Sequence, residues 1–110
     1  HIENKEMADA IEEICQIPEI DVVFVGPADM SQSLGIPGKA KDPRVVDIAL
    51  KVIETAEKYG KAGGIAVGKD NMDMYIQHGA RYIMYSSDAA LFAGALKNTV
   101  SLFEPYRGKE

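Results

Sequence analysis

Short apolar runs alternate with helical patterns along the whole of this 110-residue chain. The three apolar runs, each typical of a buried strand, cover residues 20–25, 62–67 and 81–85. The four segments with apolar residues at helical spacing cover residues 5–16, 42–59, 70–79 and 88–104. Because helices and strands alternate in this way in right-handed βαβ units, the sequence predicts an α/β fold with a parallel sheet.

Three strands are few for a parallel sheet. Such a sheet is covered on both faces, either by two layers of helices or by closure into a barrel. Three strands with four helices leave sheet edges open, so we expect the chain to be part of a larger fold. No low-complexity stretch or linker divides it, and residues 1–110 are interpreted as a single segment.

The composition argues against several classes of partner. Twelve basic and seventeen acidic residues give a net charge of −5 without a Lys/Arg cluster, which argues against binding to nucleic acid. No apolar stretch approaches the ~20 residues of a membrane span. Cys15 is the single cysteine and lies at a core position of the first helical pattern, which predicts a buried thiol and a reducing, cytoplasmic location.

The first apolar run is followed directly by the turn Val25-Gly-Pro-Ala-Asp-Met-Ser31, which presents the carboxylate of Asp29. Ligands of parallel α/β folds bind at the carboxyl ends of strands, and Glu3 stands where one more strand would end. Two carboxylates at neighbouring strand ends suit Mg²⁺ or Mn²⁺. Spacing alone nevertheless favours simpler roles, with Glu3 as an acid in the first turn of a helix and Asp29 as a turn or cap residue.

Five motifs, in unbroken order, resemble the HpcH/HpaI aldolase family. They are His1-Ile-Glu3, Val25-Gly-Pro-Ala-Asp-Met-Ser31, Leu34-Gly-Ile-Pro-Gly38, Gly60-Lys-Ala-Gly-Gly-Ile65 and Gly79-Ala-Arg-Tyr82. The resemblance spans nearly the whole chain and implies the C-terminal half of a (β/α)8 TIM barrel of the phosphoenolpyruvate/pyruvate superfamily type. It also implies a metal-dependent class II pyruvate aldolase.

The resemblance assigns roles to individual residues. It implies that Glu3 and Asp29 are the protein ligands of a divalent cation, Mg²⁺ or Mn²⁺ in the first place, with Co²⁺ and Zn²⁺ as alternatives. It places the pyruvate carboxylate on the backbone around Ala28 and Asp29. Gly26 and Ala28 suit this role because small residues let the main chain approach a ligand, while Pro27 stiffens the turn.

Two further positions are expected to face the substrate. His1 stands where the family usually has a polar residue near the substrate and the water on the metal. Ala66 is smaller than the usual apolar residue of the family, which predicts a wider pocket for the aldehyde. The implied reaction is the reversible cleavage of a 4-hydroxy-2-keto acid to pyruvate, through its enolate, and an aldehyde.

The resemblance also predicts what this segment lacks. The general-base His and the enolate-stabilising Arg of the family lie in the N-terminal half of its barrel, so we expect no catalytic residue here and no activity from the 110 residues alone. Barrels of the family assemble through swapped C-terminal helices, which predicts a homo-oligomer formed through residues 88–104.

Two alternatives stay open at this point. A citryl- or malyl-CoA lyase resembles the aldolases in its fold and metal carboxylates. A non-catalytic α/β binding module, such as a small receiver-like domain, would need about five parallel strands, and the sequence predicts three.

Overall fold

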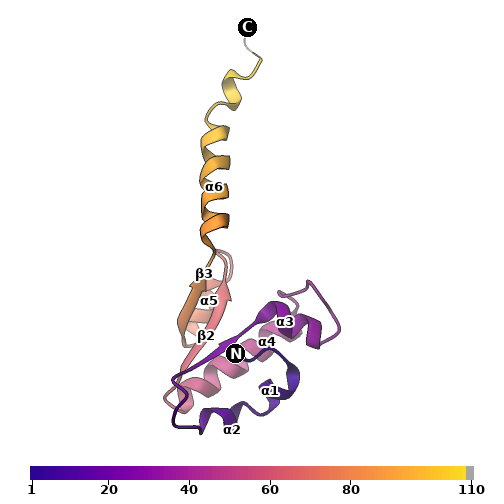
Figure 1. Ribbon diagram of the computed structural model, residues 1–110, viewed down its shortest axis with the longest axis vertical. Coiled ribbons are helices and arrows are strands. Elements are labelled where there is room, and N and C mark those ends of the chain that lie inside the picture. The colour runs from indigo at the N-terminus through magenta and orange to yellow at the C-terminus, as the bar shows by residue number, and fades with distance from the viewer. Residues whose placement is uncertain (109–110) are drawn as a thin grey trace.

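The computed structural model describes residues 1–108 and confirms the predicted alternation of helices and strands (Figure 1). The helices are α1 (Lys5–Asp9), α2 (Ile11–Cys15), α3 (Pro27–Ser33), α4 (Pro43–Lys58), α5 (Met72–Gln77), α6 (Asp88–Ser101) and the short 3-10 helix η1 (Glu104–Tyr106). The strands are β1 (Val22–Val25), β2 (Ala62–Val67) and β3 (Ala80–Tyr85).

The sheet is parallel throughout, in the order β1-β2-β3. Ile2 forms a parallel bridge to Val25 on the outer side of β1. The segment before α1 therefore lies where a further strand of the sheet would lie. The parallel α/β fold is therefore confirmed. Residues 1–108 form an open sheet, and the complete barrel stays a prediction.

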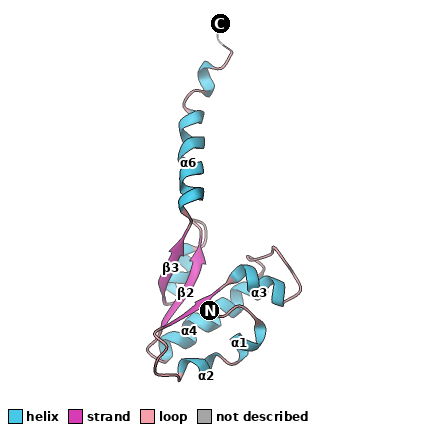
Figure 2. Cartoon of the chain, viewed as in Figure 1, coloured by secondary structure: helices cyan, strands magenta, loops and turns pink. Residues whose placement is uncertain are grey.

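One face of the sheet carries the hydrophobic core. Val25 of β1 and Ile65 of β2 are fully buried, as are Val52 and Ile53 of α4. Helix α4 packs on β1 and β2, and α2 and α3 pack against α4 (Figure 2). Cys15 of α2 is a free thiol buried in this core, as predicted, and burial raises its pKa.

The opposite face of the sheet is open. Val22, Ala66, Tyr82 and Met84 alternate with the core residues along their strands and are exposed to solvent. Phe24 is the exception, because it lies on the same face and is only 7% exposed.

Helix α4 begins and ends where the sequence predicts. The Asp42 side chain caps it by accepting a hydrogen bond from the backbone N–H of Arg44 (3.1 Å), and Pro43 occupies the first helical position. Hydrogen bonds from the Arg44 side chain and backbone lower the pKa of Asp42 to about 2. Gly60 follows the helix with φ of +71°, a left-handed conformation in which glycine is favoured.

Helix α6 extends away from the rest of the molecule (Figures 1 and 2). It gives the chain a radius of gyration of 18.0 Å and a length of 67 Å, whereas a compact domain of this size has a radius of about 13 Å. None of its residues is buried, and its apolar side chains Leu91, Phe92, Leu96 and Val100 are each at least half exposed. The described residues thus leave α6 without a partner for its apolar surface.

The first helical segment differs from the prediction. The sequence predicts one helix over residues 5–16, but the chain leaves helical geometry at Ala10 (ψ of 13°), and two short helices result. Ala8 before the break and Ile11 after it are both buried in the core. A periodic pattern does not detect such a break, because the apolar residues keep a near-helical spacing through it.

The glycines and prolines of residues 26–41 predict a loop, which is partly wrong because this segment contains α3. Gly26-Pro27 indicates the start of a loop, but Pro27 occupies the first position of this helix, where the missing N–H costs nothing. The first strand starts at Val22 and not at Ile20.

Helix caps and helix faces also differ from what the sequence predicts. The sequence predicts Asp70 and Asp88 as caps, but Asn71 and Ser87 occupy the N-cap positions of α5 and α6. The helical spacing predicts that Ile76 faces inward, but it is 47% exposed. The same spacing places Val46 and Leu50 on the apolar face of α4, where they are half-buried, whereas the fully buried positions include Val45 and Val52.

No helix within residues 1–108 has both the length and the apolar character needed to cross a lipid bilayer.

We expect Gly63→Ala to destabilise the protein. A methyl group at Gly63 would lie 2.9 Å from the Ile53 Cα, so α4 would have to move away from β2. Overpacking of this kind costs about 1–3 kcal/mol of unfolding free energy, measurable by urea denaturation. Gly94→Ala in α6 is the matched control, because a methyl group there has no neighbour within 4 Å. Equal denaturation midpoints for the two variants would contradict the close packing of α4 on β2.

Candidate functional site

The candidate site is formed where the segment before α1 meets the carboxyl end of β1. The N–H of Ile2 donates to the carbonyl of Phe24 (2.7 Å), and the N–H of Gly26 donates to the carbonyl of Ile2 (3.1 Å). These two backbone hydrogen bonds place Glu3 beside Gly26, although 22 positions separate the two along the sequence.

The carboxylates of Glu3 and Asp29 converge over Gly26. A methyl carbon placed on the Gly26 Cα would lie 3.3 Å from Asp29 Oδ2 and 3.8 Å from Glu3 Oε1. Both oxygens therefore lie within 4 Å of one point. This point is free because residue 26 is glycine and has no side chain. The structure thus brings together the two residues predicted to bind the metal.

Helix α3 determines the position of Asp29. Gly26 is its N-cap residue, and the N–H of Met30 donates to the Gly26 carbonyl (2.9 Å). Met30 and Ser31 are fully buried, and the Ser31 hydroxyl donates to the carbonyl of Ala28 (2.6 Å). These anchors hold the first turn against the core and leave Ala28 and Asp29 exposed.

The same turn carries two backbone donors. The first N–H groups of a helix have no carbonyl one turn earlier to bond to. The N–H of Gly26 donates to the carbonyl of Ile2, and Pro27 has no N–H. The N–H groups of Ala28 and Asp29 are therefore the free donors of this turn. An anionic group is the natural acceptor for them, because the helix dipole adds positive potential there.

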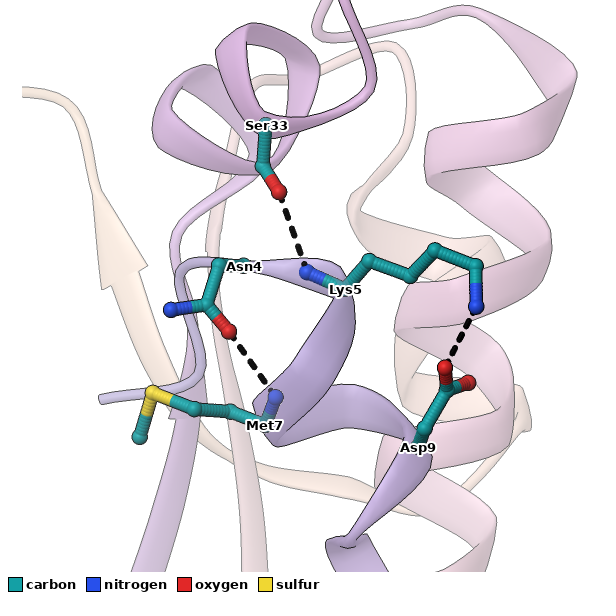
Figure 3. A network of polar contacts seen from close by, with 5 residues as sticks. All are labelled: Asn4, Lys5, Met7, Asp9 and Ser33. Carbon is teal, nitrogen blue, oxygen red and sulfur yellow. Dashed lines mark hydrogen bonds and ion pairs between the residues drawn. The ribbon is translucent and has the colours of Figure 1, made fainter.

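A second connection fixes the Glu3 segment to α3 (Figure 3). Asn4 caps α1 through its side-chain oxygen, which accepts from the N–H of Met7 (2.8 Å). The N–H of Lys5 donates to the hydroxyl of Ser33 at the end of α3 (3.1 Å), and the Lys5 side chain pairs with Asp9. The two segments that carry Glu3 and Asp29 are therefore joined by this bond as well as by the pairing of Ile2 with β1.

His1 lies against Glu3. Its Nδ1 is 3.0 Å from Glu3 Oε1, and its ring centroid is 5.1 Å from that of Phe24. Both polar side chains are accessible, with 62% of His1 and 47% of Glu3 exposed. His1 is thus close to one predicted metal ligand, and its place near the substrate and the water on the metal stays a prediction.

The donor set fits a hard divalent cation. Mg²⁺ is held in proteins by one or two carboxylates and keeps waters in its other positions, which suits an open pair such as Glu3 and Asp29. Within residues 1–108 no three His, Cys, Asp or Glu side chains gather as a larger metal-binding group would. The preference for Mg²⁺ or Mn²⁺ over Co²⁺ and Zn²⁺ stays a prediction.

Ala66 lies one residue beyond the pairing of Val25 with Ile65, near the carboxyl end of β2. It is exposed on the open face of the sheet, so a ligand can reach it. Its contribution to an aldehyde pocket stays a prediction.

His78, Arg81 and Lys41 each have an acidic partner away from the candidate site. His78 Nδ1 is 2.9 Å from Glu54 Oε1, and Arg81 pairs with Glu57 at 3.8 Å. Neither residue joins Glu3 and Asp29. Lys41 pairs with Asp70 and lowers the pKa of that carboxyl, which links the loop after α3 to the turn after β2.

Sequence patterns missed two residues near the site, Phe24 and Tyr82. Their rings make an edge-to-face contact at 5.9 Å, across the intervening strand. The signal was the alternation of Val22 and Phe24 with core residues, which places Phe24 on the open face. Ser86, at the carboxyl end of β3, has φ of +60°, which no sequence pattern indicated.

Comparison with known proteins gives consistent matches. The family model "HpcH/HpaI aldolase/citrate lyase" matches residues 1–95. The 2-keto-3-deoxy-L-rhamnonate aldolases of Escherichia coli O1:K1 / APEC and of Escherichia coli strain K12 are each 36% identical to this chain over 104 residues. Each alignment covers 94% of this chain and 39% of the relative, so the chain spans about two fifths of the length of these enzymes.

Two solved structures are similar as well. An HpcH/HpaI aldolase from Desulfitobacterium hafniense DCB-2 matches with a TM-score of 0.81 and 29% identity, over 94% of this chain and 41% of that one. An HpcH/HpaI aldolase/citrate lyase family protein from Burkholderia cenocepacia J2315 matches with a TM-score of 0.85 and 30% identity, over 91% and 39%.

We expect Gly26→Ala to weaken binding of a divalent cation. The backbone of Gly26 (φ of −97°) accepts alanine, but the new methyl group would lie between the two carboxylates, 3.2 Å from Glu3 Cγ. Mn²⁺ affinity measured by calorimetry should fall about tenfold or more, the range seen when the surroundings of metal ligands are altered. Gly94→Ala serves as control, and unchanged affinity in Gly26→Ala would contradict a cation held between Glu3 and Asp29.

Proposed function

Because this chain belongs to the HpcH/HpaI aldolase/citrate lyase family, we propose that it supplies the metal-binding and pyruvate-binding part of a class II aldolase. The proposed reaction is the reversible cleavage of a 4-hydroxy-2-keto acid to pyruvate and an aldehyde. One observation carries the proposal, namely that the Glu3 and Asp29 carboxylates converge over Gly26 beside two free backbone donors.

Glu3 and Asp29 are the proposed protein ligands of the cation. When bound, a divalent cation acts as a Lewis acid that stabilises the negative charge of the pyruvate enolate. The negative charges of the two carboxylates would attract the cation. His1 contacts Glu3 Oε1 and is itself exposed. His1 is thereby close enough to meet a substrate or a water in the same opening.

The first turn of α3 is the proposed seat of the pyruvate carboxylate. The N–H groups of Ala28 and Asp29 are free, and the exposed position of both residues lets a substrate reach them. Gly26 has no side chain to obstruct the approach, and Pro27 restricts the backbone of the turn. This arrangement would orient the keto acid with its carboxylate on the helix.

The proton-transfer groups are proposed to come from outside these 110 residues. His78 and Arg81 pair with Glu54 and Glu57 and do not join the site. The chain spans about two fifths of its aldolase relatives. We therefore propose that it forms part of a TIM barrel whose other strands carry the general base and the enolate-stabilising cationic group.

The relatives point to a class of substrate. Those that are 36% identical act, by name, on 2-keto-3-deoxy-L-rhamnonate. A 2-keto-3-deoxy sugar acid is accordingly the proposed substrate class, with Ala66 widening the side of the pocket that holds the aldehyde. The identity with these relatives favours the aldolase over the CoA-dependent lyase, and a sheet of three described strands does not support the receiver-like module.

The metal role of Asp29 is tested by Asp29→Ala in the full-length parent protein. Loss of a ligand to a Lewis acid should lower kcat/KM about 100-fold or more, and EDTA should inactivate the unmodified enzyme. Asp73→Ala is the control, because Asp73 is also an exposed acid in the first turn of a helix, α5. Equal activity and equal metal dependence of the two variants would show that Asp29 is only a first-turn acid.

We further propose that α6 packs against a second copy of the protein. Replacement of Phe92 and Leu96 by Asp should shift the sedimentation coefficient to that of a smaller species, because both side chains are more than half exposed in the single chain. Asn98→Asp introduces one such charge on the same helix, without removing an apolar side chain, and should leave the assembly intact. A wild-type protein that sediments as a monomer at high concentration would contradict this proposal.

A further inference from the structure

Three rings form a row on the open face of the sheet. The His1 ring lies 5.1 Å from that of Phe24 at an interplanar angle of 37°, and Phe24 lies 5.9 Å from Tyr82 at 88°. Both separations fall within the range in which aromatic rings attract one another. The row begins at the Glu3 end of the site and reaches β3.

Gly64 makes this row possible. It is the strand partner of Phe24 on one side and of Tyr82 on the other, so any side chain at this position would stand between the two rings. A methyl carbon on Gly64 would lie 2.9 Å from Phe24 Cδ2 and 3.0 Å from Tyr82 Cβ. Glycine at this position therefore lets side chains from two non-adjacent strands meet.

His1, the first ring of the row, contacts the candidate metal ligand Glu3. His1 Nδ1 is 3.0 Å from Glu3 Oε1, and with its proton on Nδ1 the imidazole donates to the carboxylate. Exposed side chains such as these lose rotamer freedom when they are held in one orientation. Phe24 is only 7% exposed and is itself held by Tyr82, so it offers His1 a fixed surface.

We propose that Phe24 and Tyr82 are positioning residues that hold the His1 ring, and through it the Glu3 carboxylate, in the orientation that faces Asp29. Hydrogen-bond partners of metal ligands orient them in this way, and their loss weakens metal binding. The inference deepens the proposed function, because it rests on Glu3 as a metal ligand.

The test compares Tyr82→Leu with two matched variants. Tyr82→Leu removes the ring that supports Phe24, whereas Tyr82→Phe keeps it. Met84→Leu alters the next residue on the same open face of β3, which is similarly exposed. We expect Mn²⁺ affinity by calorimetry to fall about tenfold in Tyr82→Leu and to stay at the wild-type value in the other two.

His1→Ala gives a second test of the proposal, and this substitution lies outside the three strands. If the rings act through His1, the double variant His1→Ala/Tyr82→Leu should bind Mn²⁺ no more weakly than His1→Ala alone. Additive losses would overturn the proposal, as would wild-type affinity in Tyr82→Leu.

Nuclear magnetic resonance of the metal-free protein separates this inference from the proposed function. The imidazole proton resonances of His1 should shift in Tyr82→Leu and stay in place in Tyr82→Phe. Unchanged His1 resonances in Tyr82→Leu would overturn the positioning role. A wild-type protein that binds no Mn²⁺ would instead refute the metal site, and the His1 resonances would still decide whether the rings hold the imidazole.

Discussion

The pairing of Ile2 with β1 is the contact on which the candidate site depends. Two backbone hydrogen bonds, to Phe24 and from Gly26, bring the beginning of the chain to the carboxyl end of a strand. Without them Glu3 would have no fixed relation to Asp29, since the two residues come from segments separated by both short helices and β1. The bond from Lys5 to Ser33 adds a second constraint on the same two segments.

Glycines determine how closely the parts of this molecule approach one another. Gly63 lets α4 pack onto β2, Gly64 lets Phe24 meet Tyr82, and Gly26 leaves space between two carboxylates. None of these three adopts a left-handed conformation, so their role is spatial and not conformational. The core face, the open face and the site therefore each depend on the absence of a side chain.

The sequence predicts most of the fold and part of the site. Residues 62–67 and α4 were predictable because apolar runs, Asp42-Pro43 and Gly60 are local signals. The break at Ala10 was not predictable, because the apolar spacing continues through it, and helix α3 was not, because Gly26-Pro27 is compatible both with a loop and with a helix that has proline at its first position. Asp29 could be found from its place after a strand, but its approach to Glu3 and the contact of Phe24 with Tyr82 depend on strand pairing, which spacing does not encode.

Helix α6 has a consequence for how the protein folds. An isolated helix of this length is only marginally stable in water, and most of the stability of a helix comes from packing of its apolar side. The described residues offer α6 no such packing. The free energy that keeps residues 88–101 helical must therefore come from whatever covers them. If that is a second copy, mass action makes the helix content of this segment depend on protein concentration, so that its folding and the assembly form one coupled equilibrium.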